Sequence, residues 1–252
     1  MIRTKALHIL ILSITGAAMM SIMGVALTGC GPKQPTVAER RAEKHVRDSL
    51  DLMAQEKSIA YYDSLLQAVS PTIDPLLKRF LYEKNEQYED HGHYVHRLLK
   101  TDSNTRRNFL QAYVQDDSKM LITSYYFGET SLCQSRITLT ADSLTTSFTG
   151  DTHYFEAEGF HETLTLSNDD AVQLLKFVDM NHDKRIKVTL EGKSKYKYFL
   201  SENDKTALME TYQLGVIMQD IHQLEVQIKQ TSLQISKYQR RLGKYNTKNT
   251  QN

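Results

Sequence analysis

Residues 109–127, FLQAYVQDDSKMLITSYYF, contain the clearest structural signal in the middle of the chain. Between Phe109 and Val114 two sets of side chains alternate along the chain, and a similar run extends from Met120 to Phe127. Alternation with a period of two is typical of a β-strand, because successive side chains point to opposite faces. The intervening residues 116–118 (DDS) form a polar turn. The stretch therefore predicts an antiparallel hairpin.

The same pattern recurs on both sides of this hairpin. Short alternating runs cover residues 137–139, 154–157, 160–166, 186–190 and 196–200, with glycine-containing turns at 128–129, 150–151 and 191–192. One short helix is expected near 169–178, where Ser167 begins a polar cap. Hairpins in series predict an α+β protein. Residues 71–200 would then form an antiparallel β barrel or sandwich of about eight or nine strands.

A long helix is expected on the N-terminal side of this β domain, over residues 36–70. Thr36 and Glu39 match a capping box, which satisfies the first free amides of a helix. The apolar positions of the predicted helix are Ala42, Val46, Leu50, Met53 and Ala60. Pro71 should end it, because proline disfavours helical backbone in the residue before it.

A second long helix is expected over residues 201–244, opened by a capping box at Ser201 and closed by Gly243. Its apolar seam recurs at steps of three and four: Leu214, Ile217, Ile221, Leu224, Ile228, Thr231, Ile235, Tyr238 and Leu242. Such a seam is typical of a coiled coil, although a single helix on a globular core has a similar pattern. We expect the two long helices to pair as an antiparallel coiled-coil stalk. Residues 245–252 would be a disordered basic tail, whose cations suit either the helix dipole or anionic headgroups.

The first 29 residues have the three parts of a secretory signal. Arg3 and Lys5 precede an almost wholly apolar stretch, residues 6–27, and small residues lead to Cys30. Residues 27–30 (LTGC) resemble the lipobox of bacterial lipoproteins. That resemblance implies cleavage before Cys30, a lipid on its thiol and acylation of the new amino terminus, with palmitate as a typical chain. Residues 30–35 would be the lipidated tether. An uncleaved membrane span is the alternative, since about 20 apolar residues cross a bilayer.

The residues after Cys30 indicate a location within the cell envelope. Position 31 is glycine rather than aspartate, and residues 31–35 contain no acid. Retention at the inner membrane, which aspartate signals in some Gram-negative bacteria, is therefore not expected. The absence of an acidic cluster disfavours export to the cell surface of a Bacteroidetes species. The periplasmic face of the outer membrane is the favoured location.

The layout of the mature chain resembles a set of uncharacterised Bacteroidetes lipoproteins, in which two paired helices flank a β domain. The stretches that carry this resemblance are residues 80–86 (FLYEKNE) and 198–205 (YFLSENDK). The resemblance covers most of the mature chain and implies no known activity.

Composition excludes some classes of function. The 252-residue chain has a formal net charge of +1, which becomes −1 once Arg3 and Lys5 leave with the signal peptide. Such a balance gives no reason to expect a nucleic-acid partner. With Cys30 acylated, Cys133 has no intramolecular partner for a disulfide. Its place in an expected strand over residues 132–137 predicts a buried, inert thiol.

The densest set of possible metal ligands is His91, His93 and His96, preceded by Glu89 and Asp90. On a strand, His91 and His93 would share one face and His96 would point away. Zinc would then need His96 or an acid brought round by a turn. A solvated loop is the simpler interpretation, and no metal site is predicted.

Two acidic stretches resemble functional sites only in part. Residues 179–183 (DMNHD) open like a calcium-binding loop, yet the sixth position is not glycine and Leu190 stands at the twelfth. A helix-to-strand turn is expected there instead. Glu156, Glu158 and Glu162 could act as acid and base, but they alternate with apolar residues and predict a solvated strand face.

These patterns predict no catalytic residue and no cofactor, and an enzyme is not expected. They predict a non-catalytic lipoprotein of the cell envelope, a structural or interaction module held on the membrane through Cys30. Its β domain would bind an envelope protein or a cell-wall component. Capture of a small ligand or glycan is the alternative, which a concave, tyrosine-rich pocket would favour. A metal-dependent enzyme is the third and least favoured interpretation.

Overall fold

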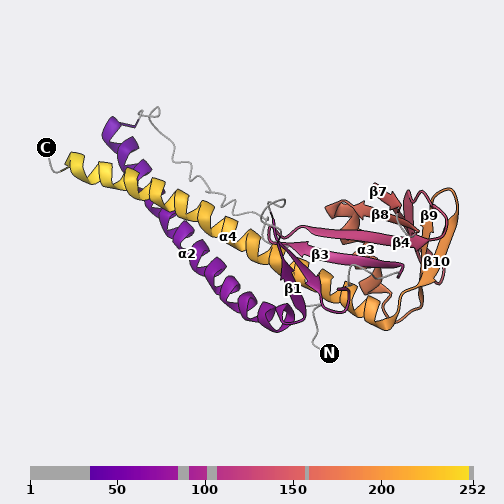
Figure 1. Ribbon diagram of the computed structural model, residues 1–252. Coiled ribbons are helices and arrows are strands. Elements are labelled where there is room, and N and C mark those ends of the chain that lie inside the picture. Colours follow the sequence, from indigo (N-terminus) through magenta and orange to yellow (C-terminus); the bar gives the residue numbers. More distant parts are fainter. Residues whose placement is uncertain (1–34, 85–90, 101–106, 157–158, 250–252) are drawn as a thin grey trace. The chain divides into compact units, whose positions relative to one another are not determined.

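The computed structural model describes residues 35–84, 91–100, 107–156 and 159–249, and Figure 1 shows its helices and strands. The chain divides into two compact units, residues 1–43 and 44–252. The described part of the first unit includes the start of helix α2 (Val37–Leu77). There the Thr36 N–H donates to Glu39 Oε2 at 2.7 Å, and the Glu39 N–H donates to Thr36 Oγ1 at 3.2 Å. The predicted capping box is confirmed.

The described strands of the second unit form two antiparallel sheets (Figure 1). The six-stranded sheet has the order β1 (Phe80–Glu83), β2 (His93–His96), β3 (Phe109–Gln115), β4 (Met120–Gly128), β8 (Phe160–Leu166) and β7 (Asp151–Glu156). The four-stranded sheet has the order β10 (Lys195–Phe199), β9 (Ile186–Glu191), β5 (Arg136–Ala141) and β6 (Leu144–Thr149). With helices α2, α3 (Asn168–Met180) and α4 (Glu202–Asn249), the α+β class is confirmed. Within the described residues neither sheet closes into the barrel that was one of the two expected architectures.

Strands β3 and β4 form the hairpin predicted from residues 109–127, with Phe109 opposite Tyr125. At its turn the Gln115 N–H donates to the Lys119 carbonyl at 2.8 Å, and Ser118 has a φ of +67°. A three-residue loop that ends in a left-handed residue is a common connection, because its twist matches that of the strands.

The inner faces of both sheets bury an aliphatic core. Its almost fully buried members include Leu110, Ala112, Val114, Met120, Ile122, Ile137, Leu139, Leu164, Leu166, Ile186, Val188 and Leu190. Helix α4 packs against β2 and β3, and α3 packs against β4 and α4. Burying one such leucine or isoleucine contributes about 1.5–3 kcal/mol. Because the helices lie on the core side, the outer face of the six-stranded sheet is left available for a site.

Helix α2 is longer than expected. It continues through Pro71 and Pro75 to Leu77, whereas the proline rule placed its end at residue 70. A proline inside a helix loses one backbone hydrogen bond. Here Ile73 and Leu77 pack against the core. Packing on the core therefore outweighs the local preference, as it does for most helices in folded proteins.

Helix α4 also extends past its expected end. It runs through Gly243 to Asn249, in place of the first part of the expected disordered tail. The Tyr245 ring lies 5.4 Å from the His45 ring, and its hydroxyl donates to Asp48 Oδ2 at 3.5 Å. These contacts come from a part of the chain remote in sequence. A helix-end rule based on neighbouring residues could not include them.

The covered side of α2 is not the side that carries the apolar residues Val46, Leu50 and Met53. Val46, Leu50 and Met53 are 58%, 62% and 55% exposed. The covered stripe recurs at steps of three and four and consists of His45, Asp48, Leu52, Gln55, Ile59, Tyr62, Leu66 and Val69. On α4, by contrast, every position of the predicted seam from Leu214 to Leu242 is buried or half-buried.

Cys133 does not lie in a buried strand, contrary to the expectation. Residues 131–135 are irregular, β5 begins at Arg136, and the thiol is exposed. The backbone of Cys133 has a φ of +50°, which is uncommon for a residue with a side chain. The reason is Glu162, because its carboxylate accepts the backbone N–H groups of residues 132–134.

Candidate functional site

The outer face of the six-stranded sheet, opposite the core, contains a groove of about 480 Å³. Its lining residues are Glu83, His91, His93, Val95, Gln111, Tyr113, Gln115, Thr123 and Tyr125. The volume lies within the range of about 300–1,000 Å³ that is typical of small-molecule sites. Among the described residues of this lining Val95 is the one aliphatic side chain, and the others are polar or aromatic.

Strand pairing brings these residues onto one face. Gln115 lies opposite His93, which in turn lies opposite Glu83, and Gln111 lies opposite Thr123. Successive cross-strand rows are about 7 Å apart, because two residues of a strand span that distance. Backbone hydrogen bonds of the sheet hold the rows in place. The side chains of the groove therefore start from a rigid platform.

Aromatic rings form part of the lining. The rings of Tyr113 and His93 have their centroids 5.2 Å apart, and Tyr125 stacks on Phe109 at 4.8 Å with 5° between the planes. Phe109 is only 3% exposed, so Tyr125 rests against a buried ring. Burial, with a smaller effect of Tyr113, raises the pKa of Tyr125, and its phenol stays neutral at physiological pH. The tyrosine rings offer flat aromatic surface to the groove.

Amide groups supply most of the remaining chemistry. Gln111 and Gln115 each carry an acceptor and two donors. Glu83 contributes a carboxylate whose Oε1 accepts from Lys100 Nζ at 2.9 Å and whose Oε2 lies 3.9 Å from His93 Nε2. Lys100 therefore balances much of that charge. The lining suits a ligand rich in hydroxyl or amide groups better than an ion.

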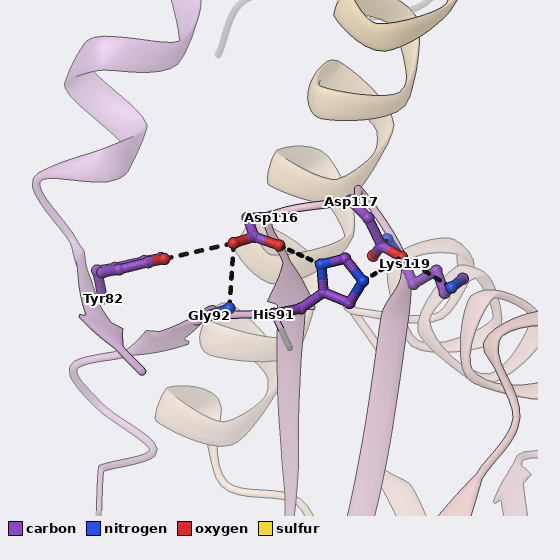
Figure 2. A network of polar contacts seen from close by, with 6 residues as sticks. All are labelled: Tyr82, His91, Gly92, Asp116, Asp117 and Lys119. Carbon is purple, nitrogen blue, oxygen red and sulfur yellow. Dashed lines mark hydrogen bonds and ion pairs between the residues drawn. The ribbon is translucent and has the colours of Figure 1, made fainter. Parts of the chain in front are cut away.

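His91, which lines the groove, is held by a network of polar contacts around Asp116 (Figure 2). Asp116 Oδ1 lies 2.9 Å from His91 Nδ1. Asp116 Oδ2 accepts the Gly92 N–H at 3.1 Å and the Tyr82 hydroxyl at 3.4 Å. A Cβ atom on Gly92 would lie 2.1 Å from the Tyr82 hydroxyl oxygen. The Tyr82 ring can therefore lie where it reaches Asp116 only because residue 92 is glycine.

Asp117 continues the network on the other side of the imidazole, and Figure 2 shows the His91 ring between the two carboxylates. His91 Nε2 lies 3.8 Å from Asp117 Oδ2, which is 2.7 Å from Lys119 Nζ. Burial raises the pKa of both aspartates, but their hydrogen bonds and cationic neighbours outweigh it and lower both pKa values. Asp116 and Asp117, which we call the rim of the groove, therefore stay ionised at neutral pH.

The same geometry limits what His91 can do chemically. Both of its ring nitrogens face carboxylates, and none of its hydrogen bonds within the described part of the chain reaches a hydroxyl or thiol group. Among the residues that the structure describes, no three or more histidines, cysteines or acids are grouped so that they could hold a metal ion. The contacts of Asp116 and Asp117 therefore serve to hold the His91 side chain and the Gly92 backbone in place beside the groove.

The structure separates the three histidines of the sequence cluster. His91 and His93 line the groove, whereas His96 is 3% exposed and faces α4. His96 Nδ1 accepts the Leu98 N–H at 3.2 Å, which places the proton on Nε2, 2.8 Å from Glu210 Oε2. His96 thus links β2 to α4 on the core side and does not belong to the groove.

The described residues of the acidic stretches noted in the sequence do not belong to the groove. Glu162 is not on a solvated face, because it is 3% exposed and bonded to residues 131–134. Residues 181–184 form the turn between α3 and β9, as the helix-to-strand interpretation predicted. The positions that lie outside the described residues or side chains are Cys30, Glu89, Asp90, Glu156 and Glu158.

The sequence assigned no role to Gln111, Gln115, Thr123 or Tyr125. A signal was present, because polar or aromatic side chains occupy every second position of residues 109–115 and of residues 123–127. Their combination with Glu83 depends on β1 and β2 pairing beside β3. No local pattern shows which strands become neighbours.

No family model, curated protein or solved structure matches this chain. Within the described residues, no helix has the length and apolar character needed to cross a membrane.

Proposed function

We propose that this protein is a lipid-anchored, extracytoplasmic binding protein whose β domain captures an uncharged, hydroxyl-rich ligand of the glycan type. The observation that carries the proposal is the groove lining, in which Tyr113 and Tyr125 lie among Gln111 and Gln115 on one sheet. Aromatic faces pack against the C–H faces of a sugar ring, and amides pair with its hydroxyl groups. Side chains on strands hold such positions better than side chains on loops.

Charge supports a neutral ligand. Lys100 balances the Glu83 carboxylate, and burial keeps the Tyr125 phenol neutral. The rim residues Asp116 and Asp117 are ionised, and Lys119 balances the charge of Asp117, so the carboxylate of Asp116 is the charge that would disfavour an anionic ligand there. A ligand with many hydroxyl groups and no net charge meets these conditions best.

The anchor part of the proposal rests on residues 1–30. A diacylglyceryl group on Cys30, with a further chain on the amino terminus, would give stable attachment, since each buried methylene contributes about 0.8 kcal/mol. We place the mature protein in the outer membrane facing the periplasm, as the residues after Cys30 favour.

The proposal also includes how the helices and sheets pack, as a stalk and a sandwich. An antiparallel coiled-coil stalk of α2 and α4 would hold the β domain away from the lipid. The covered seam of α4 and the 3.5 Å contact between Arg241 Nη1 and Asp48 Oδ1 support such pairing. Side chains from both sheets belong to one hydrophobic core, which supports a sandwich arrangement.

A non-catalytic structural or interaction module is the second candidate function. The exposed apolar positions Val46, Leu50 and Met53 on one face of α2 favour it, because such a stripe is often covered by a partner protein. An envelope protein or cell-wall component would then be the main ligand, and the groove would be secondary.

Screening the full chain against an array of neutral oligosaccharides, followed by titration calorimetry on the best ligand, tests the groove. Tyr113→Ala and Gln111→Ala should each weaken binding about tenfold, which corresponds to about 1.4 kcal/mol. Tyr154→Ala is the matched control, because this tyrosine is 71% exposed on β7 and absent from the groove lining. If no neutral oligosaccharide binds, or if Tyr113→Ala and Tyr154→Ala weaken binding equally, the groove is not a glycan site.

A further inference from the structure

The outer face of the four-stranded sheet is a second open surface, on a different sheet from the groove. Ile137, Leu139, Val188 and Leu190 are fully buried, so the side chains between them point away from the core. The outward positions are Arg136, Thr138 and Thr140 on β5, Thr145, Ser147 and Thr149 on β6, Lys187, Thr189 and Glu191 on β9, and Lys195, Lys197 and Phe199 on β10. We name this set of twelve residues the basic face.

Positive charge on the basic face exceeds negative charge. Four of its side chains are cationic and one, Glu191, is acidic. Glu191 lies 3.2 Å from Lys195 Nζ and 3.9 Å from Arg136 Nη1, so two cations share this carboxylate. Lys187 and Lys197 take part in no ion pair within the part of the chain that the structure describes. Their charge is therefore available to an external anion.

The register places the two available lysines close together. Lys197 lies opposite Thr189, and Lys187 is two residues from Thr189 along β9. Such diagonal neighbours on one face are about 7–8 Å apart. The two lysine side chains therefore start close together on one face and give this part of it positive charge.

Hydroxyl groups occupy most of the remaining surface. Thr138 and Ser147 lie 2.8 Å apart through their oxygens, and Thr145 Oγ1 donates to Thr140 Oγ1 at 3.4 Å. Cross-strand pairs of this kind hold short side chains in place. Hydroxyls both donate and accept, so they can pair with the hydroxyls of a polymer.

Apolar anchors are scarce on the basic face. Phe199 is its one apolar side chain, and the Arg185 guanidinium lies 3.6 Å from the centroid of that ring. A protein interface depends on aromatic or aliphatic anchors. A membrane-docking surface inserts such side chains into lipid. Duplex DNA is usually held by about six to ten cation–phosphate contacts, more than the available lysines supply.

We propose that the basic face docks a linear carboxylated polysaccharide. Lys187 and Lys197 pair with its carboxylates, and the threonine and serine hydroxyls of β5 and β6 pair with its sugar hydroxyls. An extended chain lying across the strands meets both groups. This interaction goes beyond the neutral-ligand groove and needs none of its residues.

Calorimetric titration of the full chain in detergent with polygalacturonate tests the proposal, with neutral dextran as the reference. We expect polygalacturonate to bind with an affinity that falls as salt is added. Any binding of dextran belongs to the proposed neutral-ligand groove, and the lysine substitutions should leave it unchanged. Lys187→Glu/Lys197→Glu should weaken binding about tenfold or more, because it replaces two attractive charges by two repulsive ones. Lys187→Arg/Lys197→Arg keeps the charge and should bind within about twofold of the unaltered chain.

The matched control is Lys229→Glu/Lys237→Glu, which makes the same change of net charge at two exposed positions of α4. Tyr113→Ala, in the groove, should leave polygalacturonate binding unchanged. The proposal fails if polygalacturonate does not bind, or if the α4 control weakens binding as much as the β9–β10 variant. It also fails if a DNA duplex or phosphatidylglycerol vesicles bind more tightly than polygalacturonate through the same two lysines.

Discussion

Glu162 is a buried carboxylate that organises the connection between the two sheets. It lies on β8 and is 3% exposed. Its Oε1 accepts from Ser131 Oγ at 2.8 Å, Leu132 N–H at 2.7 Å and Cys133 N–H at 2.9 Å, and its Oε2 accepts from Gln134 N–H at 2.6 Å. These donors lie between β4 of one sheet and β5 of the other. Burial raises the pKa of Glu162, but the four hydrogen bonds outweigh it and lower the pKa.

We predict that Glu162→Gln lowers the free energy of unfolding by about 2–3 kcal/mol at neutral pH, because hydrogen bonds to a charged group are worth about 1.5–3 kcal/mol. The folded-state pKa is lowered, so this stabilisation is present above the unfolded pKa of about 4.3 and is lost as pH falls through the folded value. Urea unfolding over a range of pH measures both effects. The variant should lose less stability on acidification than the unaltered chain.

Glu129→Gln is the control for this prediction, because Glu129 is exposed and follows β4 directly. It should change the free energy of unfolding by less than about 0.5 kcal/mol. Equal stability of the Glu162→Gln and Glu129→Gln variants at neutral pH would show that the connection does not depend on the carboxylate.

Residue-scale features were predictable where both partners lie close in sequence. The capping boxes at Thr36 and Ser201 involve residues three positions apart, and both form as predicted. Glu162 and its donors are about thirty residues apart. Glu162 shares the core face of β8 with Leu164 and Leu166, and its carboxylate is covered by residues 131–134. The sequence pattern therefore could not distinguish a solvated glutamate from a buried one.

At the scale of elements, periodicity identified the longer strands and all three described helices. Strands β3, β4 and β8 were predicted because seven to nine residues show a clear alternation. Strands β1 and β2, with four residues each, and β6, in which polar residues occupy most positions, were not predicted. Such segments become strands through pairing with their neighbours rather than through their own propensity.

The ends of the long helices depend on contacts between distant segments. Asp48 is 4% exposed, with Arg241 Nη1 at 3.5 Å and the Tyr245 hydroxyl at 3.5 Å. An acidic residue in the covered stripe of α2 would be costly without such partners. The contact explains how a stripe that includes Asp48 and Gln55 is covered while Leu50 is exposed.

We predict a measurable coupling between Asp48 and Arg241. In a double-mutant cycle of Asp48→Ala and Arg241→Ala, the interaction free energy should be about 0.5–1 kcal/mol, the upper part of the range for partly exposed ion pairs. Thermal or urea unfolding of the four proteins measures it. Asp51→Ala with Arg241→Ala is the control cycle and should show no coupling beyond error. A zero result for Asp48 and Arg241 would count against pairing of the two helices.

At the scale of the whole molecule, the proposed anchor predicts where the protein is found. Cys30→Ala should move the protein from the membrane fraction to the soluble fraction, because the thiol that would carry the lipid is lost. Cell fractionation with immunoblotting measures this, and mass spectrometry of the unaltered protein should detect two added acyl groups or more. Cys133→Ala is the matched control and should remain in the membrane fraction.

Two outcomes would contradict the anchor. If Cys30→Ala stays in the membrane fraction and retains residues 1–29, the apolar stretch is an uncleaved span rather than a signal peptide. If the unaltered protein is soluble and carries no lipid, the resemblance to a lipobox is accidental. Neither outcome bears on the groove or on the basic face, which have their own tests.

The amino-acid sequence by itself determined the α+β class, the central hairpin and the two long helices, because periodicity and capping depend on residues only a few positions apart. The tertiary structure alone decided which polar side chains meet. It placed Glu83 and His93 beside Gln115, buried Glu162, and turned Leu50 of α2 outward. These outcomes depend on strand order, register and the packing of remote segments. No local pattern contains that information, because a given alternation is compatible with many neighbours.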